Sequence, residues 1–193
     1  KEKILLFDTG TKGEILQHNI DQLNIDIRKV EEIVLSHQHQ DHTGGLWTVL
    51  GQNPEVTVHV PVSFSSDFKR AIKTTGAAVF SESAPDTICP GVFLTGEMGT
   101  RIAEQSLFLE SDSGLIVITG CSHPGIVEML EKTKTILDED IYMVFGGFHL
   151  MRHSEEAVRN IITRFKELGV KKCGATHCTG ESQIEMFRKA YGD

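Results

Sequence analysis

One short segment constrains this chain more than any other part of its sequence. Residues 36–45 read SHQHQDHTGG, so three histidines and an aspartate fall between positions 37 and 42. Side chains two positions apart in extended backbone point to the same side, which lets His37 and His39 share one metal ion. Asp41 and His42 come where the loop turns into a helix and are expected to face a second ion. A solvated, histidine-rich surface loop is the alternative, but the apolar strand before the segment and the apolar helix after it argue against that reading.

The donor atoms of this segment suit a divalent transition-metal ion. Imidazole nitrogens combined with one carboxylate are typical ligands of Zn²⁺, Mn²⁺ and Fe²⁺. We expect two divalent metal ions, with zinc preferred and manganese or iron as alternatives. Gly44 and Gly45 let the backbone turn tightly beneath such a site.

The size and charge of the chain limit the classes of function. Its 193 residues are enough for one domain with a substantial core, and we expect a single domain over residues 1–193. A net charge of -8 argues against binding to a nucleic-acid backbone, although a metal site can reverse the sign locally and admit a small anion. A small-molecule substrate is therefore the expected partner. The oligomeric state is left open, a homo-oligomer included.

The N-terminus and the cysteines indicate the compartment. The chain leads directly into a short apolar strand without a signal peptide, and no apolar run approaches the roughly 20 residues that span a bilayer. The four cysteines, Cys89, Cys121, Cys173 and Cys178, form no CxxC pair. This usage is typical of a reducing compartment, so we expect a cytoplasmic protein that does not bind membranes.

Short apolar strands alternate with amphipathic helices along the chain. We expect strands over residues 3–7, 32–35, 56–60, 92–95, 106–109, 115–119, 141–145 and 172–176. We expect helices over residues 15–23, 46–50, 64–72, 124–136, 154–168 and 182–191, and a loop over residues 36–42. Several polar residues directly follow strands, and they would line one rim if the strand ends lie side by side. The pattern predicts a mixed α/β domain and leaves a doubly wound sheet and a two-sheet sandwich both open.

The histidine segment resembles the HxHxDH signature of the metallo-β-lactamase superfamily. Residues 5–10, LLFDTG, are similar to the strand and DTG turn that precede this signature. The motifs ITGCSHPG at residues 118–125 and ATHCTGE at residues 175–181 lie where the family places its later ligands. Together with GGFHL at residues 146–150, they resemble one branch in particular, the dihydropterin/ribofuranosylaminobenzene-phosphate synthase-like proteins, which are related to a step in methanopterin biosynthesis.

The resemblance covers nearly the whole chain and implies a fold. That fold is an α+β, four-layer αββα sandwich with a dinuclear metal site on one edge. Only residues 1–3 precede the DTG strand, so we expect the fold to lack its first strands. The resemblance also implies that Asp8 does not bind metal itself but contacts a metal ligand and fixes its orientation. The alternative is that Asp8 is a simple turn residue.

The same resemblance implies a set of metal ligands: His37, His39, Asp41, His42, Glu97, His123 and His177. The sequence departs from the family pattern at two places. The turn that usually carries a histidine reads LTGEM at residues 94–98, so Glu97 is either a replacement ligand or a surface carboxylate. The usual bridging aspartate is missing next to Cys121, and we favour His123 over this thiol because an exposed thiolate would be prone to oxidation. A core or helix-capping role is the alternative for His177.

The chemistry that follows is metal-assisted. We expect a hydrolase or related transferase that acts on a small, phosphorylated or pterin-like molecule through a metal-activated water. Asp41 would bind metal and orient the nucleophile, and His149 would contact the substrate or protonate the leaving group. A metal-containing ligand-binding or sensing module without turnover is the alternative. A di-iron redox protein is disfavoured because His39 stands where such relatives have a glutamate, and a nuclease is disfavoured by the acidic composition.

Overall fold

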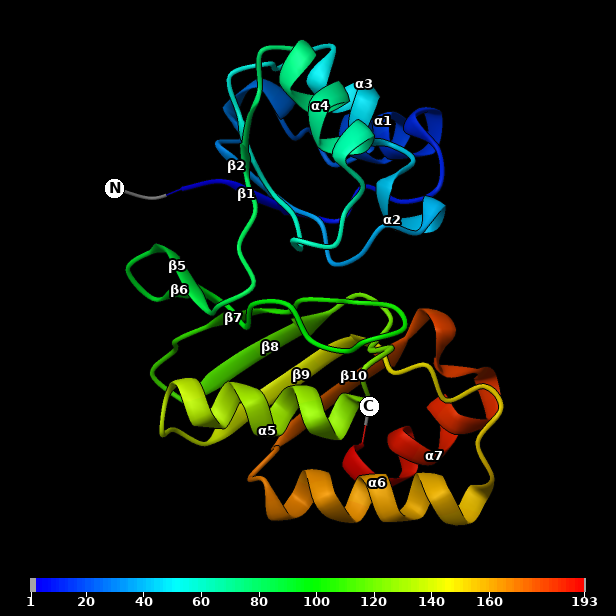
Figure 1. Ribbon diagram of the computed structural model, residues 1–193. Helices are drawn as coiled ribbons and strands as arrows, with labels where there is room; N and C mark the ends of the chain where they lie inside the picture. Colours follow the sequence, from blue (N-terminus) through cyan, green and yellow to red (C-terminus); the bar gives the residue numbers. More distant parts are fainter. Residues whose placement is uncertain (1–2, 193) are drawn as a thin grey trace. The chain divides into compact units, whose positions relative to one another are not determined.

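The computed structural model describes residues 3–192 of the chain. The chain divides into two compact units, an N-terminal unit over Lys1–Ser83 and a C-terminal unit over Ala84–Asp193 (Figure 1). Each unit has its own sheet and its own buried core. The expectation of a single domain stays a prediction. Among the described residues, no helix combines the length and the apolar character needed to cross a membrane.

The N-terminal unit is built on a sheet of short parallel strands. In order across the sheet they are β1 (Leu5–Phe7), β2 (Glu32–Val34), β3 (Thr57–His59) and β4 (Ala78–Phe80). The helices of this unit are α1 (Gly13–Gln22), the 3-10 turn η1 (Ile27–Lys29), α2 (Gln40–Thr43), α3 (Leu46–Leu50) and α4 (Ser66–Thr74). Every connection between successive strands contains a helix, as parallel pairing requires.

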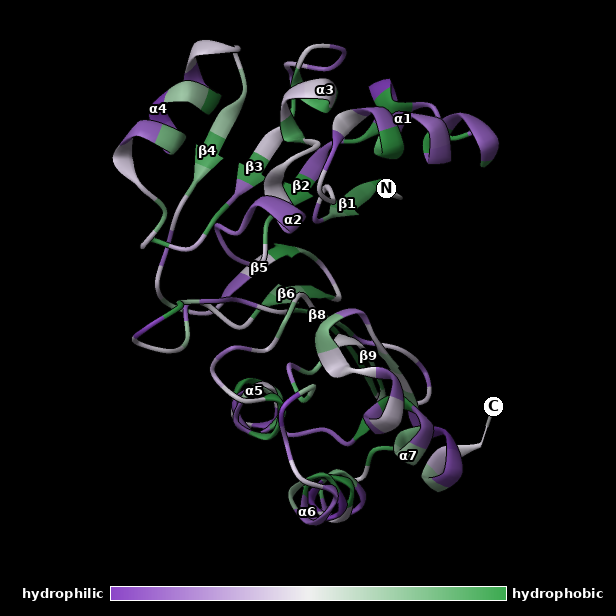
Figure 2. Cartoon of the chain, turned by 90° about the vertical axis from the view of Figure 1, so that its right-hand side faces the viewer, coloured by the Kyte–Doolittle hydropathy of each residue, from purple (hydrophilic) through white to green (hydrophobic). Residues whose placement is uncertain are grey.

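Apolar residues at helical spacing attach these helices to the sheet. The buried core of the unit combines residues of the helices and the strands, among them Ile20, Leu46, Val49 and Ile72 from the helices and Ile33 and Val58 from the strands. Helices α1 and α4 carry both hydrophobic and hydrophilic residues along their length (Figure 2), as expected for helices with one buried face. Ser65 caps α4, because its Oγ accepts a hydrogen bond from the backbone N–H of Phe68 at 3.2 Å.

The C-terminal unit is built on a larger, mixed sheet. In order across it the strands are β10 (Lys172–Thr176), β9 (Ile141–Gly147), β8 (Leu115–Thr119), β7 (Leu107–Leu109), β6 (Val92–Leu94) and β5 (Asp86–Cys89). The strands β8, β9 and β10 are parallel, and the pairs from β5 to β8 are antiparallel. The helices are α5 (Ile126–Ile136), α6 (Glu155–Glu167), the 3-10 turn η2 (His177–Thr179) and α7 (Glu181–Tyr191).

Three phenylalanines join the helices of this unit in its core. The ring centroids of Phe148, Phe165 and Phe187 lie 5.3–5.6 Å apart, and all three side chains are buried. These separations allow edge-to-face contacts, which add to the free energy of burial. Helix α6 begins after Ser154, whose Oγ accepts a hydrogen bond from the N–H of Ala157 at 3.3 Å, as the sequence predicts.

Each expected strand and helix is present, with ends that shift by a few residues. The sequence analysis did not predict β4 and β5, and the loop expected over residues 36–42 is wrong in its second half. There, α2 begins after His39, because the carbonyl of His39 accepts hydrogen bonds from the N–H of Thr43 at 3.1 Å and from its Oγ1 at 3.0 Å. Asp41 lies in the first turn of this helix, where a negative charge is favourable.

The expected rim of polar residues is confirmed within each unit. Strands β1 and β2 are parallel neighbours, so Asp8 and the histidine segment follow them at one edge of the N-terminal sheet. Strands β8, β9 and β10 are also parallel neighbours, so His123, His149 and His177 follow them at one edge of the C-terminal sheet. Parallel pairing therefore gathers side chains that are far apart in the sequence.

A buried ion-pair network connects the strands of the N-terminal sheet. The carboxylate of Glu32 is 10% exposed, pairs with Lys3, and lies 2.9 Å from Nε2 of His59 on the adjacent strand. Burial alone would raise the pKa of Glu32, but the hydrogen bonds and charges of Lys3 and His59 outweigh it and hold the pKa below its usual value. The ionised carboxylate is therefore the form that the folded protein stabilises.

The Glu32→Gln variant is expected to lose stability in a pH-dependent way. A carboxyl whose pKa is lowered on folding contributes stability that is present above its ordinary pKa and is lost as the pH falls through the folded value. At pH 7 the variant should be less stable than the wild type by about 1–3 kcal/mol, and the difference should shrink in acid. Urea unfolding at several pH values measures this, with exposed Glu55→Gln as the control. A difference that does not depend on pH would contradict the role of the charge.

Candidate metal centre

The histidines of residues 36–45 converge in the N-terminal unit. The side chain of His37 is buried, and its ring centroid lies 4.6 Å from that of His39 and 4.2 Å from that of His42. Nε2 of His37 is 3.0 Å from Nδ1 of His39. Nε2 of His42 is 3.4 Å from Oδ2 of Asp41. The structure thus brings together the four residues of this segment that the sequence predicts as ligands.

Asp8 fixes this arrangement from the end of β1. Its Oδ1 accepts a hydrogen bond from the N–H of Ser36 at 2.7 Å, and its Oδ2 accepts one from Oγ of Ser36 at 2.8 Å. Oδ2 also lies 2.6 Å from Nδ1 of His42. Burial raises the pKa of Asp8, although the hydrogen bonds from His42 and Ser36 act in the opposite direction. Asp8 thus contacts a histidine of the segment, and the expectation that it fixes the orientation of a metal ligand stays a prediction.

Two glycines allow the DTG turn to approach the histidine segment. The N–H of Gly44 donates to the carbonyl of Gly10 at 2.8 Å. A Cβ at Gly44 would lie 1.9 Å from the carbonyl oxygen of Thr11, and a Cβ at Gly45 would lie 2.2 Å from that of Thr9. Any side chain at either glycine would therefore push the turn away, which explains why the sequence has glycine at both positions.

Glu104 holds His123 in the C-terminal unit in a comparable way. Its fully buried carboxylate accepts hydrogen bonds from the backbone N–H groups of Cys121, Ser122 and His123 at 2.8–2.9 Å. Oε2 of Glu104 also lies 2.9 Å from Nδ1 of His123. A carboxylate on Nδ1 fixes the orientation of the ring, and Nε2 is then the atom that could bind a metal ion.

The sequence analysis missed Glu104, because no motif marks it. It lies just before β7 in the stretch RIAEQS, and a glutamate beside a strand is normally an exposed residue. Only the folded chain shows that it reaches a loop that comes 17–19 residues later.

The remaining predicted site residues of the C-terminal unit have different surroundings. The ring of His149 lies 4.5 Å from that of His123, centroid to centroid. His177 is exposed at the start of η2. His149 and His177 both have left-handed backbone, with φ of 54° and 52°, an unfavourable conformation that clusters at functional sites. Glu97 is half-buried after β6, beside the short bridge between Met98 and Glu104.

A second group in this unit contains two thiols. One ligand atom from each of Cys121, His149 and Cys178 lies within 4.8 Å of the others. Sγ of Cys178 donates a hydrogen bond to the carbonyl of Cys121 at 3.5 Å. A hydrogen bond with the Cys121 thiol, with further contributions from His149 and His177, lowers the pKa of Cys178 against the opposing effect of burial. The sequence analysis gave Cys178 no role, although it directly follows His177.

The donor set of the histidine segment fits a divalent metal ion. Two nitrogens on one tetrahedral zinc ion, with bonds of about 2.0–2.1 Å, lie about 3.3 Å apart. The observed separation of 3.0 Å between Nε2 of His37 and Nδ1 of His39 is close to that value. Nδ1 of His42 is taken by Asp8, so its Nε2 is the atom that could bind metal. The residues present therefore match the chemistry of Zn²⁺, Mn²⁺ or Fe²⁺.

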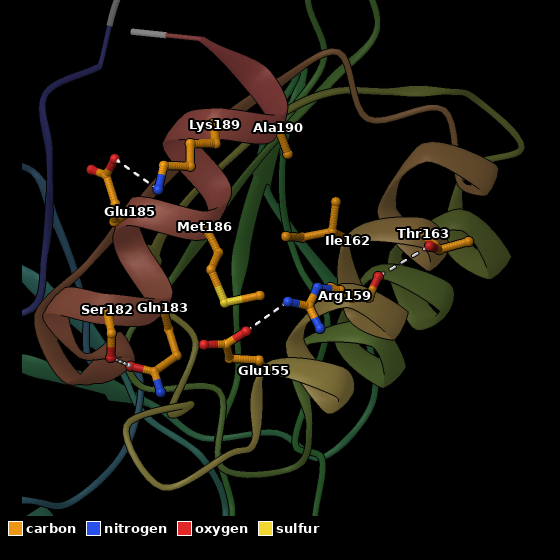
Figure 3. Close-up of a pocket in the computed structure, with 10 residues that line it drawn as sticks. All are labelled: Glu155, Arg159, Ile162, Thr163, Ser182, Gln183, Glu185, Met186, Lys189 and Ala190. Atoms are coloured by element: carbon orange, nitrogen blue, oxygen red, sulfur yellow. Dashed lines mark hydrogen bonds and ion pairs between the residues drawn. The ribbon is translucent and has the colours of Figure 1, made fainter.

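A hollow on the helical side of the C-terminal unit does not resemble a binding site. It has a volume of about 790 Å³ and lies between α6 and α7 (Figure 3). Its charged side chains pair with one another, Arg159 with Glu155 at 2.6 Å and Lys189 with Glu185 at 3.7 Å. None of the residues that line it belongs to the predicted ligand set.

Comparisons with known proteins identify the family. Residues 1–136 match the family model of the metallo-beta-lactamase superfamily. The chain is 32% identical to the 7,8-dihydropterin-6-methyl-4-(beta-D-ribofuranosyl)-aminobenzene-5'-phosphate synthase of Methanocaldococcus jannaschii, a match that covers 98% of this chain and 80% of that protein. This relative is of the branch that the sequence motifs indicate.

Solved structures agree with this assignment. The crystal structure of Tm1679, a metal-dependent hydrolase of the beta-lactamase superfamily, matches with a TM-score of 0.80 and 29% identity, over 97% of this chain and 83% of that one. The short form of human tRNase Z matches with a TM-score of 0.61 and 15% identity, over 90% of this chain and 80% of that one, and shares the fold. The expected fold class is confirmed. With its HxHxDH segment, its supporting Asp8 and these matches, the chain belongs to the metallo-β-lactamase superfamily.

Proposed function

We propose that this protein is a dinuclear, metal-dependent hydrolase or related transferase that acts on a small, phosphorylated or pterin-like molecule. The observation that carries the proposal is the convergence of His37, His39 and His42 in one short segment, with Asp8 contacting the Nδ1 of His42. Imidazoles that a buried carboxylate orients through one ring nitrogen are typical of metal sites.

Each unit of the chain contains some of the proposed ligands. The N-terminal unit supplies His37, His39, Asp41 and His42. The C-terminal unit supplies His123 and His177, with Glu97 as a further candidate. His123 is the better-supported of these because Glu104 fixes the orientation of its ring through Nδ1. Glu97 has the weakest support, since it belongs to none of the groups of potential metal-binding side chains found among the described residues.

The substrate class follows from the relative. The name of the M. jannaschii enzyme describes a product with a reduced pterin, an aminobenzene ring and a ribofuranosyl phosphate. A substrate with a phosphate group would carry negative charge, which a protein with a net charge of -8 could bind only where cations are concentrated. Metal ions would provide that local positive charge.

The residues of the chain have separate parts in this chemistry. Bound divalent ions would supply Lewis acidity and lower the pKa of a water molecule towards neutrality. Asp41, 43% exposed and 3.4 Å from Nε2 of His42, would bind metal and orient the attacking nucleophile. His149 is exposed and would bind a polar group of the substrate or protonate the leaving group. Asp8 and Glu104 would keep the histidines in place throughout.

Replacing Asp41 by alanine is expected to abolish turnover and leave the protein folded. The carboxylate is partly exposed and forms no part of the buried core, so its loss should cost little stability. With p-nitrophenyl phosphate, a thioester and a lactone as probes, activity should fall at least about 100-fold. Circular dichroism checks the fold, and Asp67→Ala, a change at an exposed residue of α4, is the control.

Full turnover by the Asp41→Ala variant would refute the mechanism. Metal binding without turnover of any ester by the wild type would instead support a sensing module.

Asp8→Asn is expected to weaken metal binding without removing a ligand. The amide is nearly the same size as the carboxylate, but it carries no charge to stabilise His42 in the orientation that leaves Nε2 for metal. Loss of a partner behind a metal ligand typically reduces metal affinity about 10–100-fold. Competition with a chromogenic chelator measures this affinity, with exposed Asp21→Asn as the control. Wild-type affinity in Asp8→Asn would show that Asp8 is only a turn residue.

A further inference from the structure

Two cysteines meet at the carboxyl ends of the three parallel strands of the C-terminal unit. Cys121 follows β8, and Cys178 lies in η2 directly after β10. Their sulfur atoms are within 4.8 Å of each other, and Sγ of Cys178 donates a hydrogen bond to the carbonyl of Cys121. The proposed function gives neither thiol a role, and the two are separated by 57 positions in the sequence.

A glycine of the strand between them makes this meeting possible. Strand β9 separates β8 from β10 in the sheet, and its last residue is Gly147. A Cβ at this position would lie 2.8 Å from Sγ of Cys178 and 3.2 Å from Cα of Cys121. Any side chain at Gly147 would therefore occupy the space across which the two cysteines approach each other.

Hydrogen bonds hold both cysteine-bearing segments at the end of β9. Oγ of Ser122, next to Cys121, donates to the carbonyl of Gly147 at 2.7 Å. Near Cys178, Oγ1 of Thr179 accepts from the N–H of Phe148 at 3.0 Å and donates to the carbonyl of Thr176 at 2.6 Å. The two segments are thus fixed to the same short stretch of backbone, which keeps the two cysteines close.

We propose that Cys121 and Cys178 are a thiol pair that a peroxide oxidises to a disulfide. A disulfide has an S–S distance of about 2.05 Å, so the sulfurs need to move closer by less than about 3 Å. Rotation of the two side chains about χ1, together with a small shift of the two segments that carry them, can supply such a movement. Cys178 is the half-buried thiol and meets the oxidant first, whereas Cys121 is only 4% exposed and acts second.

The two steps balance with hydrogen peroxide as the oxidant. The sulfur of Cys178 attacks one peroxide oxygen, so an S–O bond forms, the O–O bond breaks, and the other oxygen leaves as water after taking the thiol proton. The sulfur of Cys121 then attacks the resulting sulfenic acid, so the S–S bond forms and the S–O bond breaks, and a second water leaves. Overall, two thiols and one peroxide give one disulfide and two waters.

The disulfide would link the two segments that carry the candidate ligands His123 and His177, a consequence that rests on the proposed function. Cys121 is two residues from His123, and Cys178 directly follows His177. Drawing the sulfurs together would move the backbone that carries both histidines. We therefore expect the oxidised protein to hold metal less well than the reduced protein, which makes the thiol pair a redox control of the metal centre.

Peptide mapping of the peroxide-treated holoprotein tests the thiol pair independently of metal and turnover. The intact mass should fall by about 2 Da, the two hydrogens of the thiols, and return after dithiothreitol. Under non-reducing conditions one linked peptide pair should contain Cys121 and Cys178. Sulfinic or sulfonic acids at these positions without a linked pair, or links to Cys89 instead, would overturn the proposal.

Matched variants separate the pair from general thiol oxidation. Cys178→Ser and Cys121→Ser should each prevent the mass loss, and Cys173→Ser should not, because burial raises the pKa of Cys173 to about 12 and keeps this thiol unreactive. A mass loss that persists in Cys178→Ser would refute the assignment.

Metal content before and after peroxide treatment tests whether the disulfide controls metal binding. A loss of metal from the wild type that Cys178→Ser prevents supports redox control. Equal retention of metal by the wild type and the variant overturns it.

Discussion

The hydrogen bonds of Asp8 are the interaction on which the arrangement of the N-terminal unit depends. One carboxylate at the end of β1 binds the backbone and side chain of Ser36 after β2 and the imidazole of His42 in α2. Ser36 extends this hydrogen-bond network to His37, because its Oγ lies 2.9 Å from Nδ1 of His37. Two of the three histidines of the segment therefore have their Nδ1 atoms occupied. Asp8 thus orients His42 directly and His37 through Ser36.

The C-terminal unit has a comparable buried carboxylate, that of Glu104. Glu104 is fully buried and binds three consecutive backbone N–H groups and Nδ1 of His123. A buried carboxylate costs free energy unless it is hydrogen-bonded, and both Asp8 and Glu104 meet that condition by binding several donors. In each unit, a carboxylate outside the ligand set keeps a candidate ligand in one orientation.

Much of this organisation could be predicted from the sequence because it depends on local patterns. Apolar runs indicate the strands, helical spacing indicates the helices, and the spacing of His37, His39, Asp41 and His42 is itself typical of metal ligands. Strand β4 was missed because it is only three residues long and half exposed, so it has no clear apolar pattern. Helix α2 was missed because its stability comes from hydrogen bonds to the carbonyl of His39. Such bonds cannot be recognised from a sequence pattern.

The parts that could not be predicted depend on contacts between distant residues. Glu104 has the sequence context of an exposed acid, and its role exists only because the loop after β8 folds back on it. Cys121 and Cys178 belong to different motifs, and they meet because the strand between them ends in a glycine. Periodicity and motifs reveal elements and ligand types, whereas the groups that orient the ligands become visible only when the strands are paired.

The most direct test of this account is the metal content of the protein, measured by elemental analysis after purification without chelator. The dinuclear proposal predicts about two equivalents of a divalent metal in the wild type, most of it absent from a variant that combines His37→Ala and Asp41→Ala. That result would identify the metal and justify a search for the substrate with that ion. Clearly less than one equivalent in the wild type would contradict the central claim, because the oriented histidines would then serve the fold and not a metal ion.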